Sequence, residues 1–190
     1  MTKVIENAAL LVMDVQPGIV ERLDNKVEYL AKVKAAVAAT HQKHLPVIYV
    51  VVGFRPDFPE VSARNKSFSS IKDALPAGLV DPQPAITPAD GDIVVVKRRV
   101  SAFAGSDLEI VLRAKGIQHL VLTGIATSGV VLSTLREAAD KDFQLTVLSD
   151  LCADFDPEVH KVLLEKVFPR QAAVITSEQW LSKDAKKADS

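Results

Sequence analysis

Hydrophobic residues gather into six short, nearly continuous runs along the chain. Runs in which apolar and polar residues do not alternate are typical of strands that are buried on both faces. Longer segments with helical spacing lie between most of these runs. Strands that alternate with helices predict a parallel sheet covered on both sides. The predicted strands are Ala8–Met13, Val47–Val52, Ile93–Val96, His119–Thr123, Gln144–Ser149 and Ala172–Thr176.

The segments with helical spacing complete a doubly wound, Rossmann-like α/β fold. We expect a mostly parallel six-stranded sheet with helices on both faces, in three αβα layers. Asp156 and Pro157 are typical of a helix start, with an N-cap followed by proline at the first helical position. The predicted helices are Val20–Lys43, Ser69–Leu75, Asp107–Lys115, Gly129–Lys141 and Pro157–Phe168.

One segment, Gly53–Gly91, shows little periodicity and carries six of the ten prolines. We interpret it as a long ordered excursion or lid, because long loops in compact α/β domains often border a site. The chain has 190 residues, of which 48% are hydrophobic and 25% charged. This length supports one well-buried core, so we expect one domain over residues 1–182 and a frayed tail over 183–190.

The charge balance argues against large charged partners. The formal net charge is −1, with cations scattered among acids, so no broad basic field would attract nucleic acid or an anionic membrane. The lone cysteine, Cys152, has no partner for an internal disulfide, and the apolar run Ala8–Met13 is too short to cross a membrane. We therefore expect a cytoplasmic protein with neither nucleic acid nor membrane among its partners.

Polar residues follow three of the predicted strands. Asp14 ends the first and Lys97 the third, while the fourth runs into the turn Gly124–Val130. Ligands of open α/β sheets bind beyond the carboxyl ends of the strands, where these three features can meet. Each residue also has a simpler interpretation. Asp14 could cap the next helix or be a carboxylate at the rim of the sheet, and Lys97 could be a solvated charge in a loop.

Together these features resemble the isochorismatase-like hydrolases, within the cysteine-hydrolase superfamily that also contains nicotinamidases and carbamoylsarcosine amidohydrolases. The resemblance covers nearly the whole chain. Its strength lies in the order and spacing of four matching segments. These are 10–16 (LLVMDVQ), 96–108 (VKRRVSAFAGSDL), 122–134 (LTGIATSGVVLST) and 150–154 (DLCAD).

The resemblance implies roles for the residues of the site. Asp14 would be the acid/base residue and Lys97 its cationic partner. Val130 would occupy the position that holds the nucleophilic cysteine in the amidohydrolase members. The resemblance also implies a non-proline cis peptide bond at Ile125–Ala126. The turn that contains this bond, in which we include Gly129, would direct backbone N–H groups toward an oxyanion. The family also implies a small-molecule substrate and a homo-oligomer.

Valine at position 130 changes the expected chemistry, because an isopropyl group cannot attack an amide as a thiolate does. True isochorismatases resemble this chain in lacking that cysteine, and in them the aspartate protonates a vinyl ether so that water completes the cleavage. We therefore expect a hydrolase that uses Asp14 and Lys97 without covalent catalysis. The alternative is a catalytically silent binding or scaffold protein that kept the pocket.

Further residues are assigned around this site. We expect Gln16 and Arg55 to contribute to substrate binding, and Phe103 to do so or to pack beneath the lid. Cys152 is interpreted as a small buried hydrophobe.

Metal ions and organic cofactors are not expected. The segment after the second strand lacks the histidines of metal-dependent nicotinamidases, and the first strand leads into no G-x-G-x-x-G turn. Thr127 and Ser128 are expected to cap the helix that follows them or to bond locally to its first amides. Trp180 is interpreted as an anchor of the C-terminal segment against the sheet or against a neighbouring subunit.

Overall fold

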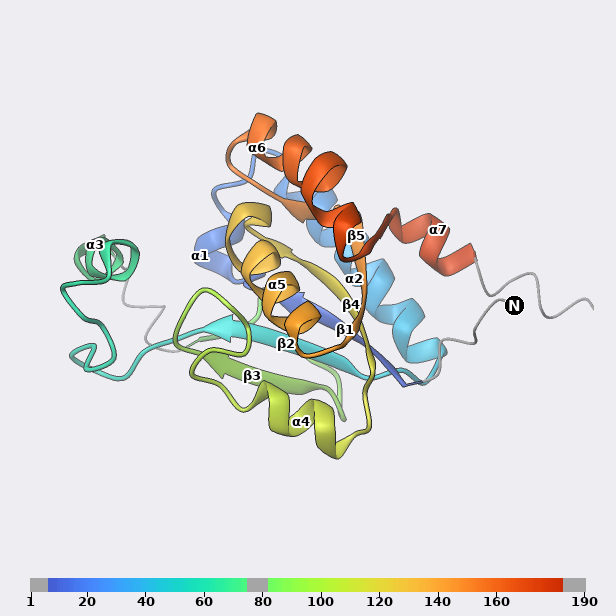
Figure 1. Cartoon of the computed structure of the whole chain (residues 1–190), viewed down its shortest axis with the longest axis horizontal. Helices are drawn as coiled ribbons and strands as arrows, with labels where there is room; N and C mark the ends of the chain where they lie inside the picture. The colour runs from blue at the N-terminus through green and yellow to red at the C-terminus, as the bar shows by residue number, and fades with distance from the viewer. Residues whose placement is uncertain (1–6, 75–81, 183–190) are drawn as a thin grey trace, which may run out of the picture.

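A computed structural model of the chain describes residues 7–74 and 82–182 (Figure 1). Its centre is a six-stranded sheet in the order β3-β2-β1-β4-β5-β6, in which every neighbouring pair is parallel. The chain reverses direction across the sheet between β1 and β4, so these strands form the topological switch point. The strands are β1 (Ala8–Met13), β2 (Val47–Val52), β3 (Ile93–Lys97), β4 (His119–Ile125), β5 (Gln144–Ala153) and β6 (Ala173–Ile175).

Helices cover both faces of the sheet and bury two apolar clusters (Figure 1). On one face, side chains of β1 such as Leu11 pack with Leu112 of α4 and Leu135 of α5. On the other face, Leu10 packs in a cluster with Val33 of α2 and Trp180 of α7. The helices are α1 (Pro17–Val20), α2 (Lys26–Gln42), α3 (Lys66–Ala74), α4 (Leu108–Ala114), α5 (Leu132–Asp140), α6 (Pro157–Val162) and α7 (Ser177–Ser182).

The predicted fold class is confirmed, and all six predicted strands exist. The doubly wound three-layer arrangement follows from strands that are apolar on both faces, such as β1, whose six residues are all buried. The structure extends β4 by two residues to Ile125 and β5 to Ala153. A register shift between β4 and β5 falls at Leu122 and Gly124. Beyond this shift, Gly124 pairs with Cys152.

Helix boundaries were predicted less well. The single helix expected over Val20–Lys43 is wrong, because α1 ends at Val20 and a separate α2 begins at Lys26. The helix expected from Gly129 begins instead as a π-helical turn, Thr127–Val131, which leads into α5. Likewise α6 continues through a π-helical turn, Leu163–Val167, and a 3₁₀ turn, Phe168–Arg170. Helix α7 was not predicted.

Two smaller expectations hold. Asp156 caps α6, because its Oδ1 atom accepts hydrogen bonds from the N–H groups of Glu158 and Val159. Trp180 is 1% exposed and belongs to the cluster between the sheet, α2 and α7, so it anchors the C-terminal helix to the sheet.

The Gly53–Gly91 excursion contains α3, which replaces the shorter helix expected over Ser69–Leu75 and begins at Lys66. The prediction for Leu75 lies outside the described residues. Phe68 of α3 is buried, and its ring meets Phe54 edge to face at 5.7 Å between centroids. This contact ties α3 back to the segment that leaves β2.

Candidate active site

Asp14 and Lys97 lie at the same edge of the sheet because parallel strands end there together. Asp14 directly follows β1, and its N–H donates to the carbonyl of Val50 on β2 at 2.8 Å. Lys97 is the last residue of β3 and pairs in register with Val52 of β2. The two side chains therefore meet across the end of β2, although they are far apart in the sequence.

The ammonium of Lys97 forms an ion pair with Asp14, with 3.0 Å between Nζ and Oδ2. It also donates to the carbonyl oxygens of Arg99 at 2.8 Å and Val100 at 3.1 Å. An ammonium has three donors, and these three acceptors account for them. Lys97 is 2% exposed, so it holds Asp14 and the following loop and has no donor left for a substrate.

The second carboxyl oxygen of Asp14 is chemically unused. Oδ1 is buried and has no hydrogen-bond partner among residues 7–74 and 82–182. Burial raises the pKa of Asp14 to about 6, while the charge of Lys97 and its hydrogen bond act in the opposite direction. Burial therefore outweighs the ammonium, and the carboxyl group carries a proton more readily than an ordinary aspartate.

The end of β4 passes very close to the end of β1, which Asp14 follows. A Cβ atom on Gly124 would lie 2.4 Å from the carbonyl oxygen of Met13, so only glycine allows this approach of β4 to β1. The Ile125–Ala126 peptide bond is cis, at the position that the resemblance indicated. Val130 follows in the π-helical turn, is 2% exposed, and packs in the same apolar cluster as Met13 and Phe103.

Two backbone donors of this turn are already engaged. The N–H of Ser128 donates to Oδ2 of Asp154 at 2.7 Å. The N–H of Gly129 donates to the carbonyl of Ala126 at 3.1 Å. Gly129 can therefore serve an oxyanion only if that hydrogen bond is released.

Side chains from beyond β5 hold the same turn in place. The hydroxyl of Thr127 lies 2.8 Å from Nδ1 of His160 in α6, and Asp154 accepts from Ser128. The expectation that Thr127 and Ser128 cap the following helix is wrong, because no side-chain cap is present there. Asp154 closes the fourth matching segment, which is a weak signal for its role, whereas no sequence feature pointed to His160.

The residues expected to bind substrate lie in different environments. The amide of Gln16 is fully used by Val52, accepting from its N–H at 2.9 Å and donating to its carbonyl at 3.1 Å. Phe103 is 8% exposed and part of the core beneath α5. The Arg55 side chain is 67% exposed and pairs with Glu60 at 2.5 Å. The structure therefore brings Asp14, Lys97 and Val130 to one end of the sheet and leaves Arg55 on the surface.

Cys152 is 6% exposed, and burial raises the pKa of its thiol to about 12. A thiol with this pKa is almost entirely protonated at neutral pH, so Cys152 behaves as the small buried hydrophobe that was predicted.

Among the described residues, no group of three or more His, Cys, Asp or Glu side chains is placed to hold a metal ion. No helix in residues 7–74 and 82–182 is long and apolar enough to span a membrane.

The amino-acid sequence matches a known protein family over most of its length. The isochorismatase domain family matches residues 8–179. The uncharacterized isochorismatase family protein YecD of Escherichia coli O157:H7 is 33% identical over 183 residues, covering 93% of this chain and 96% of YecD. The ureidoacrylate amidohydrolase RutB of Methylobacterium radiotolerans is 32% identical over 158 residues, covering 73% of this chain and 60% of RutB.

A solved structure agrees with these sequence relatives. An isochorismatase family protein from Burkholderia thailandensis superposes with a TM-score of 0.79 at 31% identity, covering 93% of this chain and 94% of that chain. The family match spans both ends of the sheet, including the strands that carry Asp14 and Lys97. The chain therefore belongs to the isochorismatase family and is a hydrolase of that family.

Proposed function

We propose that this hydrolase cleaves a small molecule with Asp14 as the general acid and without a covalent intermediate at position 130. The observation that supports this role most directly is the state of the Asp14 carboxyl group. It is buried, its Oδ1 atom has no partner in the described part of the chain, and its pKa is raised to about 6 by burial. A general acid works best when its pKa lies near the operating pH.

The proposed substrate class is an enol ether. Asp14 transfers its proton to the terminal vinyl carbon, and the ether oxygen supplies electron density to form an oxocarbenium ion. Water adds to this cation and loses a proton to the Asp14 carboxylate. The resulting hemiketal breaks down to a carbonyl compound and an alcohol, so the net reaction consumes one water. This sequence needs an acid and a water but no nucleophilic side chain.

Lys97 supports this step indirectly. Because its donors are taken by Asp14 and two carbonyl groups, it fixes the carboxyl group in place and stabilises the carboxylate left after proton transfer. It also limits how far burial raises the pKa of Asp14. In this proposal Lys97 is a positioning residue that acts through Asp14.

The same turn argues against the covalent route of amidohydrolases. Val130 carries no nucleophile, and Cys152 is a protonated thiol in the core. The N–H groups of Ser128 and Gly129 are engaged within the protein, so they are not free to stabilise an oxyanion. The RutB relative is named for amide hydrolysis, and amides therefore belong in any substrate test of this chain.

The decisive experiment compares wild type with Asp14→Asn on isochorismate, other enol ethers and small amides. We expect the wild type to turn over enol ethers. The rate should fall by about 10²- to 10⁴-fold in Asp14→Asn, because a side-chain amide cannot donate a proton to the substrate as a carboxylic acid does. Asp140→Asn, at an exposed site in α5, is the matched control and should retain activity. Turnover that survives Asp14→Asn would refute the acid role, and no turnover of any compound would favour a silent binding protein.

A second variant, Val130→Cys, tests what remains of the amidohydrolase arrangement. If the rest of that site is intact, amide hydrolysis should appear in the variant and be absent from the wild type. Amide hydrolysis by the wild type itself would contradict the proposed loss of the covalent route.

A further inference from the structure

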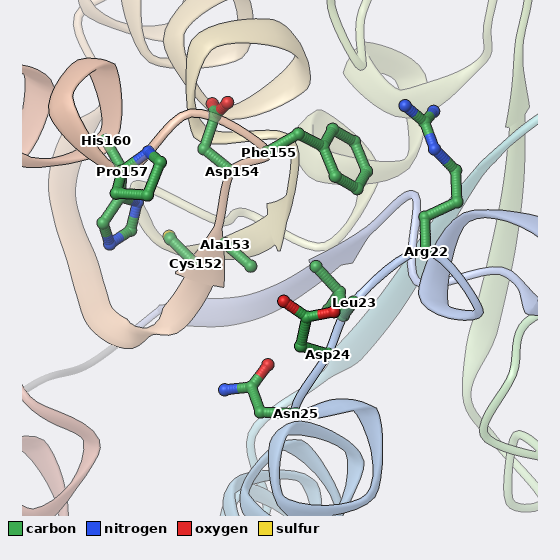
Figure 2. Close-up of a pocket in the computed structure, with 10 residues that line it drawn as sticks. All are labelled: Arg22, Leu23, Asp24, Asn25, Cys152, Ala153, Asp154, Phe155, Pro157 and His160. Atoms are coloured by element: carbon green, nitrogen blue, oxygen red, sulfur yellow. The ribbon is translucent and has the colours of Figure 1, made fainter.

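A pocket of about 410 Å³ lies between the start of α2 and the end of β5 (Figure 2). Its volume lies in the range of about 300–1,000 Å³ that is usual for small-molecule sites. One wall is the connection between α1 and α2, residues 22–25, and the other runs from the end of β5 into α6, residues 152–160. Neither Asp14 nor Lys97 lines this pocket, so it is separate from the pair described above.

The floor of the pocket is apolar. Leu23, Cys152 and Ala153 line it with hydrocarbon and a protonated thiol, and Phe155 lies on the rim with 42% of its surface exposed. Such a lining favours a ligand with a compact apolar body, which gains from leaving water.

Two charged groups of the rim already have partners. The guanidinium of Arg22 lies over the ring of Phe155, with its carbon 3.9 Å from the ring centroid. Both carboxyl oxygens of Asp154 accept backbone N–H groups, Oδ2 from Ser128 at 2.7 Å and Oδ1 from Asp156 at 3.2 Å. These contacts tie the Asp154 carboxylate to the backbone and hold the Arg22 guanidinium against the aromatic ring of the rim.

Three other polar side chains remain available. Within the described part of the chain, the Asp24 carboxylate and the Asn25 side-chain amide form neither a hydrogen bond nor an ion pair, and both lie at the wall formed by residues 22–25. Figure 2 shows these two side chains pointing toward the segment that carries Cys152 and His160. His160 uses Nδ1 for Thr127, which leaves Nε2 as its second polar atom.

The charge of the lining is negative. Arg22 contributes one positive charge against the carboxylates of Asp24 and Asp154. Burial lowers the pKa of His160, with the charge of Asp154 opposing it, so the imidazole stays neutral to a lower pH than an ordinary histidine does. An ionised carboxylate without a cationic partner attracts a positive charge from solution.

We propose that this pocket binds a small organic cation, with an ammonium group paired to Asp24 and an apolar body resting on Leu23, Ala153 and Cys152. The ammonium donates to the Asp24 carboxylate, and the Asn25 side-chain oxygen on the same wall is a further acceptor. The Nε2 atom of His160 accepts as well in the tautomer whose Nδ1–H donates to Thr127. This site is independent of the hydrolytic proposal, because it involves none of the residues that act there.

The pocket also adjoins the turn that carries Val130. Asp154 and His160, which line the pocket, are the residues that hold Ser128 and Thr127. A bound cation would therefore lie beside both attachments of the turn, which gives the pocket a physical connection to the end of β4.

The test is a titration of the ¹⁵N-labelled full chain with benzylammonium, followed by amide NMR at about pH 7.5, where an alkylammonium is charged. We expect saturable shifts concentrated in residues 22–25 and 152–160. Benzyl alcohol and benzoate have the same ring without the positive charge, and each should bind at least about tenfold more weakly, since a charge-assisted hydrogen bond is lost.

Asp24→Asn keeps the side-chain shape and removes the charge, and we expect it to weaken benzylammonium binding about tenfold. Asp140→Asn makes the same change of net charge at an exposed site in α5 and should leave the affinity unchanged. The proposal is overturned if benzoate binds more tightly than benzylammonium, if Asp24→Asn binds like wild type, or if no saturable shifts occur in the two walls.

Discussion

The Oδ2 atom of Asp14 lies 3.0 Å from Nζ of Lys97 in a setting where both residues are less than 10% exposed. Low exposure strengthens their attraction and also penalises each charge. The outcome for Asp14 is a pKa of about 6, above its ordinary 3.8, because burial has the larger effect. Two predictions concern this balance.

The first is the titration of Asp14 itself. ¹³C NMR of the side-chain carboxyl groups should show the Asp14 signal, assigned by its loss in Asp14→Asn, changing with a midpoint of about 6. Because the folded pKa lies above the unfolded one, protonation stabilises the native state. That contribution is complete below pH 3.8 and is lost as the pH rises through about 6. A midpoint at or below 3.8 would contradict the dominance of burial.

The second is the effect of Lys97→Met on the same signal. Lys97 lowers the pKa of Asp14 by its charge and its hydrogen bond, so its removal should move the midpoint above 6. Methionine keeps an apolar stem of similar length in the buried position. Lys115→Met, at an exposed site after α4, removes the same charge and should leave the midpoint where it is. An unchanged midpoint in Lys97→Met would show that the ion pair is not formed in solution.

Gly124 offers a test of how closely β4 approaches β1. Gly124→Ala places a methyl group 2.4 Å from the carbonyl oxygen of Met13, so the strands must move apart. We expect a loss of about 2 kcal/mol or more in the free energy of unfolding, measured with urea. Gly18→Ala in α1 is the control, because its new Cβ meets nothing within 4 Å. Equal stability of the two variants would be inconsistent with the close approach.

Asp154 and Asp156 provide a matched pair of carboxylates two residues apart. Asp154→Ala should accelerate hydrogen exchange at the Ser128 amide about tenfold, because a charge-assisted hydrogen bond to that N–H is lost. Asp156→Ala should instead accelerate exchange at Glu158 and Val159, whose N–H groups Asp156 caps. If both variants accelerated exchange at the same amides, Asp154 would not specifically stabilise the turn after β4.

Hydrophobic pattern was sufficient for the sheet but not for every helix boundary. Strands such as β1 are buried along their whole length, so their sequence carries little except apolar side chains. The break between α1 and α2 was missed because Leu23 is buried and continues the helical spacing across the break. Helix α7 was missed because it is short, and Trp180 is held by the cluster it enters rather than by a periodic pattern.

The sequence alone determined that Asp14 and Lys97 end parallel strands and that position 130 carries no nucleophile, because chain order and residue type are local facts. The tertiary structure decided how these residues behave. Only packing around Asp14 shows that burial outweighs the Lys97 charge. Only the fold brings His160 and Asp154 from beyond β5 to the turn after β4, since hydrogen bonds between distant segments leave no periodic signal in the sequence.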